Sequence, residues 1–241
     1  MKTKLVVFVA IALMATGIIA SLIISRPWIA FRNVEPLKVT GYAELPVESD
    51  IAIMEVTITF TANTSHQAYQ TCGEQLHILR KMVESKLPED SEIRELSSNI
   101  SEVLKRNEEG KQINVIDYYA ARRSLKITST AVEAMDELSK EIYDLTRDGI
   151  RMNVSGPRFL VSDLGDFKFE LVQAATRNGM QRAKIIAKNA KARLGNLVAA
   201  RQGVIQITQP HSTDTSSWGR YDTSTIEKVA KVTVHLELGI R

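Results

Sequence analysis

The sequence contains little cysteine, glycine and proline, and each shortage excludes a class of protein. Its 241 residues include one cysteine, Cys72, so no disulfide bond can form within the chain. Twelve glycines and six prolines are too few for a low-complexity or disordered protein. Cys72 falls on the apolar stripe of an expected helix, which favours a buried thiol over a reactive one.

Common catalytic and metal-binding motifs are also missing. The four histidines form no H-x-x-x-H or H-E-x-x-H pattern, and one cysteine cannot build a cysteine-rich zinc site. The chain has no G-x-S-x-G elbow, no phosphate-binding loop and no dinucleotide fingerprint. Because catalytic groups can come from distant segments, these absences lower the expectation of an enzyme without excluding one. We therefore expect no catalytic site, no cofactor and no bound metal ion.

The charge of the body is balanced. The chain has 31 basic and 28 acidic residues, a net charge of +3. Lys2, Lys4 and Arg26 lie in or beside the first segment, which has no acidic residue, so the excess belongs to that segment. A neutral body argues against nucleic acid as a general partner.

Residues 5–24 are an uninterrupted apolar run. Twenty such residues can cross a hydrocarbon core of about 30 Å as a helix, whereas a cleavable signal has a shorter run of about 7–15 residues. No clean A-x-A cleavage site follows, so an uncleaved signal-anchor is favoured over a signal peptide or a buried core helix. We predict an anchor and linker over 1–31, and a folded, exported domain over 32–241.

The body alternates between patterns of strand and helix. Period-two runs predict strands, of which the first two should form a tight antiparallel pair and the third and fourth a longer hairpin. Spacings of three and four predict about three packed helices, the longest ending at Gly195. The predicted strands are 37–47, 51–62, 93–104, 112–129, 151–162, 197–208 and 226–239. The predicted helices are 65–87, 130–149 and 166–194. This order predicts an α+β fold with mostly antiparallel sheet, preceded by one transmembrane helix.

A basic stripe is a candidate interaction surface on the third helix. Its members, which fall within about 60° of the helix circumference at 100° per residue, are Arg177, Lys184, Lys188 and Lys191. The second predicted helix carries six acidic residues against two basic ones. The two surfaces can be solvated faces, complementary contacts between subunits, or in the basic case a contact with anionic lipid.

The polar loop over 209–225 is a second candidate surface. It places Trp218 and Tyr221, with Arg220 between them, among serine, threonine and aspartate residues. Exposed aromatic side chains can anchor a binding partner, although such residues more often fold back onto their own domain. Both interpretations remain open from the sequence.

Three segments resemble the SIMPL-domain family of bacterial envelope proteins. VTGYAELPVESDIAIMEVTITF at 39–60 is similar to the family opening, with Ser49 where proline is usual. YYAARRSLKIT at 118–128 is similar to its Y-x-A-x-x-x-L-x-V strand, with Ile127 in place of valine. The helix from Val172 to Gly195 is similar to its closing alanine-rich helix. The residues that match are best explained as fold determinants, since the family has no established catalytic residues; they are Gly41, Asp50, Ala52, Tyr119, Ala121 and Gly195.

The resemblance implies export to the periplasm or cell surface, frequent assembly into larger oligomers and a loose link to oxidative or envelope stress. With the anchor, it predicts a single-pass protein of the bacterial inner membrane whose C-terminal domain lies in the periplasm. The leading hypothesis is an oligomeric structural or interaction module. The alternatives are a lipid- or small-ligand-binding module with a pocket between sheet and third helix, and, less favoured, a hydrolase.

Overall fold

The structure is a computed structural model that describes residues 14, 16, 20–21, 35–213 and 216–241. Most of the predicted membrane segment 5–24 therefore lies outside the described residues. Within the described residues, no helix is both long enough and apolar enough to span a membrane.

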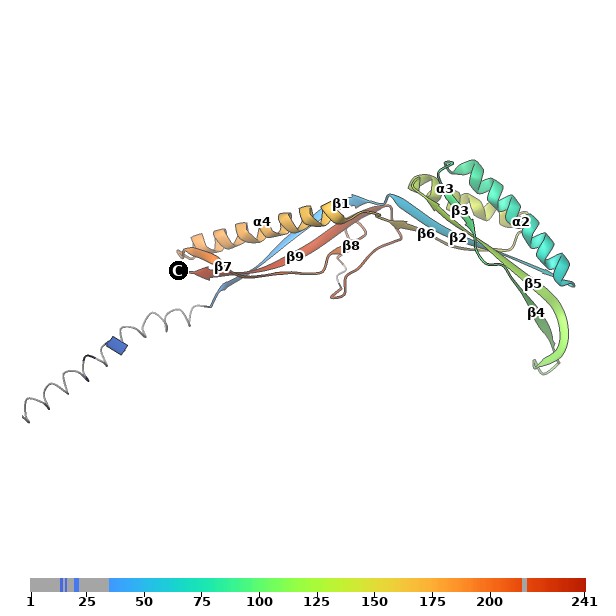
Figure 1. Cartoon of the computed structure of the whole chain (residues 1–241), viewed down its shortest axis with the longest axis horizontal. Coiled ribbons are helices and arrows are strands. Elements are labelled where there is room, and N and C mark those ends of the chain that lie inside the picture. The colour runs from blue at the N-terminus through green and yellow to red at the C-terminus, as the bar shows by residue number, and fades with distance from the viewer. Residues whose placement is uncertain (1–13, 15, 17–19, 22–34, 214–215) are drawn as a thin grey trace, which may run out of the picture. The chain divides into compact units, whose positions relative to one another are not determined.

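The chain folds into two compact units, each built from segments distant in the sequence. From residue 35 onward, unit 1 comprises 35–43, Val172–Gly203 and Val232–Arg241, and unit 2 comprises Glu44–Leu171 and Val204–Lys231. The strands are β1 (Leu37–Glu48), β2 (Ile51–Ala62), β3 (Glu92–Glu95), β4 (Asn99–Arg106), β5 (Gln112–Ser129), β6 (Met152–Leu160), β7 (Leu194–Gln202), β8 (Gln206–Thr208) and β9 (Glu227–Ile240). The helices are α2 (Ser65–Lys86), α3 (Val132–Glu141), the 3-10 turn η1 (Ile142–Thr146) and α4 (Gly165–Asn189). This is the predicted α+β class, with antiparallel strand pairs and three helices (Figure 1).

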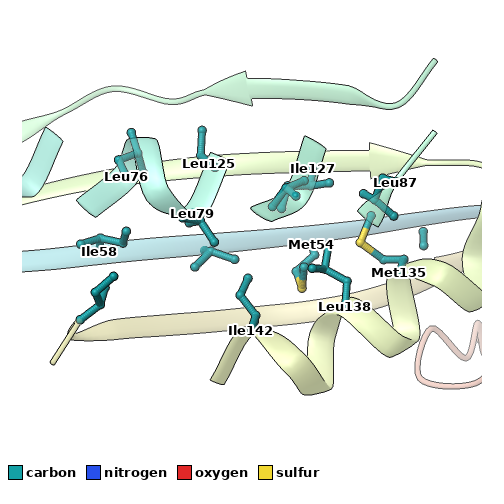
Figure 2. Packing of buried hydrophobic residues seen from close by; sticks show 14 of the residues in the cluster. Met54, Ile58, Leu76, Leu79, Leu87, Leu125, Ile127, Met135, Leu138 and Ile142 are labelled. Atoms are coloured by element: carbon teal, nitrogen blue, oxygen red, sulfur yellow. The ribbon is translucent and has the colours of Figure 1, made fainter. Parts of the chain in front are cut away.

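Unit 2 is built on a five-stranded antiparallel sheet. The order is β3-β5-β2-β6, and β4 also pairs with β5. Alternate residues of β2 point toward α2 and α3 and are fully buried, as period two requires. Figure 2 shows Met54 of β2 in one apolar cluster with Leu79 of α2 and Leu138 of α3. The buried thiol of Cys72 belongs to this cluster, as predicted.

The predicted pairing of the first two strands is wrong. β1 belongs to a sheet with β9, whereas β2 lies between β5 and β6. The residues that connect them bond elsewhere: the amide of Ser49 donates to the carbonyl of Ile226, and that of Asp50 to the carbonyl of Leu160. A short connection between two apolar runs is therefore here a crossing from one sheet to the other, which local pattern cannot distinguish from a hairpin.

Unit 1 is a sheet of β1, β9 and β7 against which α4 packs (Figure 1). The contacts Thr40–His235 and Lys38–Glu237 run in opposite numerical directions, so β1 and β9 are antiparallel. α4 ends at Asn189, not at Gly195 as predicted, and Lys191 with its positive φ of 56° turns the chain into β7. The left-handed conformation is therefore adopted by a lysine, a residue type that does not predict a turn of this kind from the sequence.

The first two helices start differently. The side chain of Thr64 caps α2 by accepting from the amide of Gln67. In contrast, α3 begins after Ala131 without a side-chain cap. The helix axis continues beyond α3 as a 3-10 turn, and Gly149 with φ 81° follows it.

Close backbone contact fixes α4 on its sheet. A Cβ atom on Gly41 would lie 2.1 Å from the carbonyl oxygen of Ala175, and one on Gly179 would lie 3.2 Å from the Cα of Gly41. Glycine is required at Gly41, because the atom that a side chain would meet belongs to the helix backbone and cannot rotate away. The small residues Ala175 and Gly179 on α4 allow this close approach.

Gly41→Ala should separate α4 from β1. We expect a loss of about 2–3 kcal/mol in the free energy of unfolding, since overpacked contacts of backbone with a new methyl group cost this much. The measurement is denaturant unfolding of the full chain in detergent. Gly239→Ala is the control in the same sheet, because its Cβ would meet no atom closer than 3.7 Å. Equal stability of the two variants would contradict the packing argument.

Candidate functional site

Trp218 lies in the described part of the 209–225 loop. Its side chain is 93% exposed, so it does not fold back onto its own unit. Gln206 of β8 holds the loop just before Trp218, because its side-chain amide group donates to the carbonyl of Ser216 at 2.5 Å and accepts from the backbone amide of Ser216 at 3.2 Å. The amide of Gly219 also donates to the carbonyl of Ser216, which closes a turn around Trp218. The sequence left two possibilities for this residue, and the structure decides for exposure.

Tyr221 has a different role from Trp218. Its hydroxyl accepts from the amide of Val161 at 2.7 Å and donates to the carbonyl of the same residue at 3.3 Å. The backbone beside it bridges to β8, since the amide of Asp222 donates to the carbonyl of Ile207. The hydroxyl of Tyr221 therefore supports the loop. Tyr221 is still 41% exposed, so its role as an interaction residue stays a prediction.

A buried ion pair holds the far end of the loop. The side chain of Lys228 is fully buried, and its ammonium group lies 3.1 Å from Asp222 and also donates to the carbonyl of Thr225. Partial burial alone would raise the pKa of Asp222, but hydrogen bonds from Thr225, Ser224 and Lys228 outweigh it. They hold the pKa of this carboxyl well below its usual range. The loop is thus rigid around an exposed tryptophan, the arrangement expected of a binding anchor.

Three members of the basic stripe, Arg177, Lys184 and Lys188, lie on the exposed side of α4. The prediction that Lys191 shares this helix face is wrong, because α4 ends at Asn189 and Lys191 lies in the left-handed turn that follows. Arg177, Lys184, Lys188 and Lys191 are all exposed, and among the residues that the structure describes none of them forms an ion pair. By contrast, the acidic helix is partly neutralised, since Lys86 pairs with Glu141 at 2.6 Å and Lys140 with Asp136 at 2.6 Å. The cations are therefore the more available of the two predicted surfaces.

The outer edge of β1 is covered by α4 side chains. Asn178 accepts from the amide of Tyr42 at 3.2 Å, and Arg182 donates to the carbonyl of Thr40 at 3.3 Å. Beside this contact lies an open hollow of about 360 Å³. Its lining combines apolar and cationic side chains: Lys38, Val39, Thr40, Arg182, Ile185 and Ile186. The hollow flanks the helix, because at Gly41 and Gly179 the backbones of sheet and helix leave no space between them.

A further surface, absent from the sequence-based candidates, is a two-stranded arm. We define the arm as residues 103–118, where β5 continues past its last pairing with β2, that of Tyr119 with Ala62. The arm pairs only β4 with β5 and reaches away from α2 (Figure 1). Its exposed apolar side chains are Ile113, Val115, Ile116 and Tyr118. The sequence contained one indication of the arm: the predicted strand 112–129 is longer than the strand 51–62, with which it pairs in the structure.

The metal-ligating side chains and the cysteine of the described residues bear on the expectation of no metal site and no reactive thiol. Within them no group of three or more histidine, cysteine, aspartate or glutamate side chains could hold a metal ion. The thiol of Cys72 lies 3.7 Å from the carbonyl oxygens of Ile58 and Ala121, and burial raises its pKa. Asp50 accepts from the amide and the hydroxyl of Ser162, which makes it a structural link between the start of β2 and the end of β6.

Together these features define an α+β protein that exposes apolar and cationic side chains on each of its two units. The sequence model of the SIMPL family, described as a protein of unknown function (DUF541), matches residues 37–237. The chain therefore belongs to the SIMPL family, and the resemblance found in the sequence is confirmed.

Other comparisons add little to this assignment. None of the curated proteins searched matches the chain. Among solved structures, the chain is similar to a candidate aminohydrolase from methicillin resistant Staphylococcus aureus, with 12% identity and a TM-score of 0.26. The match covers 56% of this chain and spans 37% of that one, a likeness that carries no argument about function.

Lys228→Met should release the Trp218 loop. Removal of one partner from a buried ion pair leaves Asp222 partly desolvated without its cation, which is strongly destabilising. We expect trypsin to cleave after Arg220 about tenfold faster or more in the folded variant, because local opening controls proteolysis. Lys168→Met, which removes an exposed lysine, is the control. Equal cleavage rates in both variants would contradict the proposed role of Lys228.

The same loop should resist mild acid. A carboxyl whose pKa is lowered by folding contributes stability that is present above the ordinary value of 3.8 and is lost only as pH falls through the lowered one. Protection of the Ser224 and Thr225 amides, which bond to Asp222, should therefore persist at pH 4. Hydrogen exchange, corrected for its intrinsic pH dependence, measures this; loss of protection between pH 6 and 4 would be the opposite result.

Proposed function

We propose that this SIMPL-family protein is a membrane-anchored, non-catalytic module of the bacterial envelope that assembles with copies of itself and presents a further binding surface. The observation that carries this proposal is the arm, residues 103–118, with four exposed large side chains and a strand edge left open. Isolated two-stranded ribbons are marginal in water, and exposed apolar side chains on them favour association.

The open edge of β5 suits a second copy of the same arm. Among the described residues, no strand pairs with the β2-facing edge of residues 112–118. Antiparallel pairing of two copies centred on Asn114 sets Lys111 opposite Asp117 and Ile113 opposite Val115. Both charges and apolar residues are then complementary, and each match occurs twice because a two-fold interface is isologous. Strand addition of this kind supplies affinity from the main chain.

The Trp218 loop suits a different partner in the envelope. An exposed tryptophan is costly to leave in water, and its preformed loop reduces the entropy lost on binding. Aromatic anchors of this type dominate many protein interfaces. The proposed anchor over 5–24 and the periplasmic placement, which follow from the sequence and the resemblance, would bring both surfaces to the same compartment. A role in oxidative or envelope stress tolerance rests on the resemblance alone.

A ligand-binding module is less well supported. It requires an enclosed pocket between the sheet and α4, whereas Gly41 lies in backbone contact with that helix and the hollow of about 360 Å³ beside this contact is open. A hydrolase is less well supported still. Cys72 is buried, and the carboxylate of Asp50 is engaged by the amide of Ser162, so neither side chain is placed to act on a substrate. Turnover in an esterase, phosphatase and peptidase screen would overturn the non-catalytic part of the proposal.

Asn114→Cys should form a disulfide-linked dimer through the arm. The cysteine faces its own copy at the centre of the proposed pairing, and the natural Cys72 is buried and cannot compete. Mild oxidation of the full chain in membranes, followed by non-reducing electrophoresis, measures the yield. Ser101→Cys, on β4 and away from the open edge, is the control.

Charge-reversal variants distinguish a disulfide formed by the proposed arm-to-arm pairing from one formed by random collision of two chains. In the Asn114→Cys background, Lys111→Asp should lower the dimer yield severalfold, since like charges then face each other. Adding Asp117→Lys should restore the yield. Equal yields in all three chains, or equal yields from Ser101→Cys, would contradict the arm-to-arm interface.

A further inference from the structure

The balanced charge of the body conceals two strongly charged units. The described segments of unit 1, residues 35–43, 172–203 and 232–241, contain nine basic residues and two acidic ones. Unit 2 contains 18 basic and 26 acidic residues. The sequence-based statement of a neutral body therefore holds only as an average, because each unit is assembled from separate stretches of chain.

The cations of unit 1 gather toward one end. From Arg177 to Arg193 the chain has six basic residues and no acidic one. The end of this stretch lies beside the C-terminus, since Arg193 and Arg241 exchange backbone hydrogen bonds of 2.7 and 2.9 Å. Lys38, near the start of β1, lies within 3.9 Å of Glu237 at the same end of β9. Favourable contact with the helix dipole explains cations in the last turn of α4, but not those further back.

This cationic end is also where the proposed anchor joins the unit. Twelve residues separate Ile24, the last of the apolar run, from Leu37 at the start of β1. Fully extended, they span at most about 43 Å, so an anchored chain keeps this end of unit 1 close to the membrane surface.

Apolar side chains accompany the cations. Ile185 is 52% exposed and lies on the helix circumference between the basic stripe and the hollow that contains Lys38 and Arg182. Ile186, in the hollow, is 46% exposed. Long cationic side chains that flank exposed aliphatic ones are typical of surfaces that lie at the boundary between lipid headgroups and acyl chains.

We propose that the C-terminal half of α4 and the Lys38–Arg182 hollow dock on anionic phospholipid headgroups of the membrane that holds the anchor. Phosphate oxygens meet Lys184, Lys188, Lys191 and the hollow, and Ile185 enters the headgroup layer. The inference rests on the proposed membrane attachment. It adds a preference for anionic lipid and specifies which face of unit 1 contacts the membrane. The positive charge of this face favours anionic phospholipid as its partner, because attraction between the lysines and the headgroups is strongest close to the membrane surface.

The test uses the full chain in nanodiscs, one copy per disc. Asn189→Cys, an exposed position one helical turn beyond Ile185, carries a nitroxide, while Cys72 is buried and stays unlabelled. The readout is collision of the nitroxide with a water-soluble nickel chelate. Discs of phosphatidylglycerol should lower this accessibility roughly threefold relative to discs of phosphatidylcholine, and 0.5 M salt should reverse the difference.

Charge-reversed variants give the matched comparison. Lys184→Glu with Lys188→Glu and Lys191→Glu should abolish the protection, whereas Lys81→Glu with Arg94→Glu and Arg151→Glu, which reverses three exposed cations of unit 2, should retain it. Equal accessibility in the two lipids overturns the proposal. Protection seen only with two copies per disc also overturns it, since the occupant would then be the acidic unit of a second copy. Failure of the chain to migrate with the disc contradicts the membrane attachment itself, which separates the two failures.

Discussion

The contact between Gly41 of β1 and the backbone of α4 fixes the arrangement of unit 1. Because no side chain separates them there, α4 can take one position along the strand, with Gly179 against Gly41. That position brings Asn178 and Arg182 to the outer edge of β1, where they bond to its exposed backbone groups. It also turns Lys184 and Lys188 outward. The chemistry of the surface thus depends on a contact made by atoms of the main chain.

Unit 2 follows a different constraint, since its sheet is covered by helices on one face only. Buried residues of β2 and β5 meet α2 and α3, and this accounts for the apolar core. The coverage ends where β2 ends, so β5 continues into the arm with one neighbour. At the other side of the unit, a buried lysine and a partly buried aspartate hold a loop whose tryptophan is exposed. Unit 2 therefore presents apolar groups to solvent at two places, the arm and Trp218, and exposed apolar groups of this kind are candidates for contact with a partner.

Period and turn residues were sufficient to predict most elements of the fold. The strand over 51–62, the helix over 65–87 and the long strand over 112–129 agree with the structure within a residue. Partner choice was not predictable, because the first two strands have the pattern of a hairpin and yet enter different sheets. The end of α4 was missed because a lysine, and not the glycine further on, takes the left-handed conformation.

The candidate surfaces were predicted in part. The exposed stripe on α4 follows from helical spacing, and Trp218 from its polar loop, but the separate role of Tyr221 depends on contact with Val161. Opposite charges on the two units could not be seen in the sequence, since both units are discontinuous along the chain. The same discontinuity explains why overall composition indicated a neutral body.

The account rests on one claim, that the protein works as an assembly held at an anionic membrane. Native mass spectrometry of the full-length chain, released directly from bacterial membranes, tests this claim. We expect a complex of two or more copies that retains anionic phospholipid. A monomer free of lipid would contradict both the assembly and its contact with the membrane.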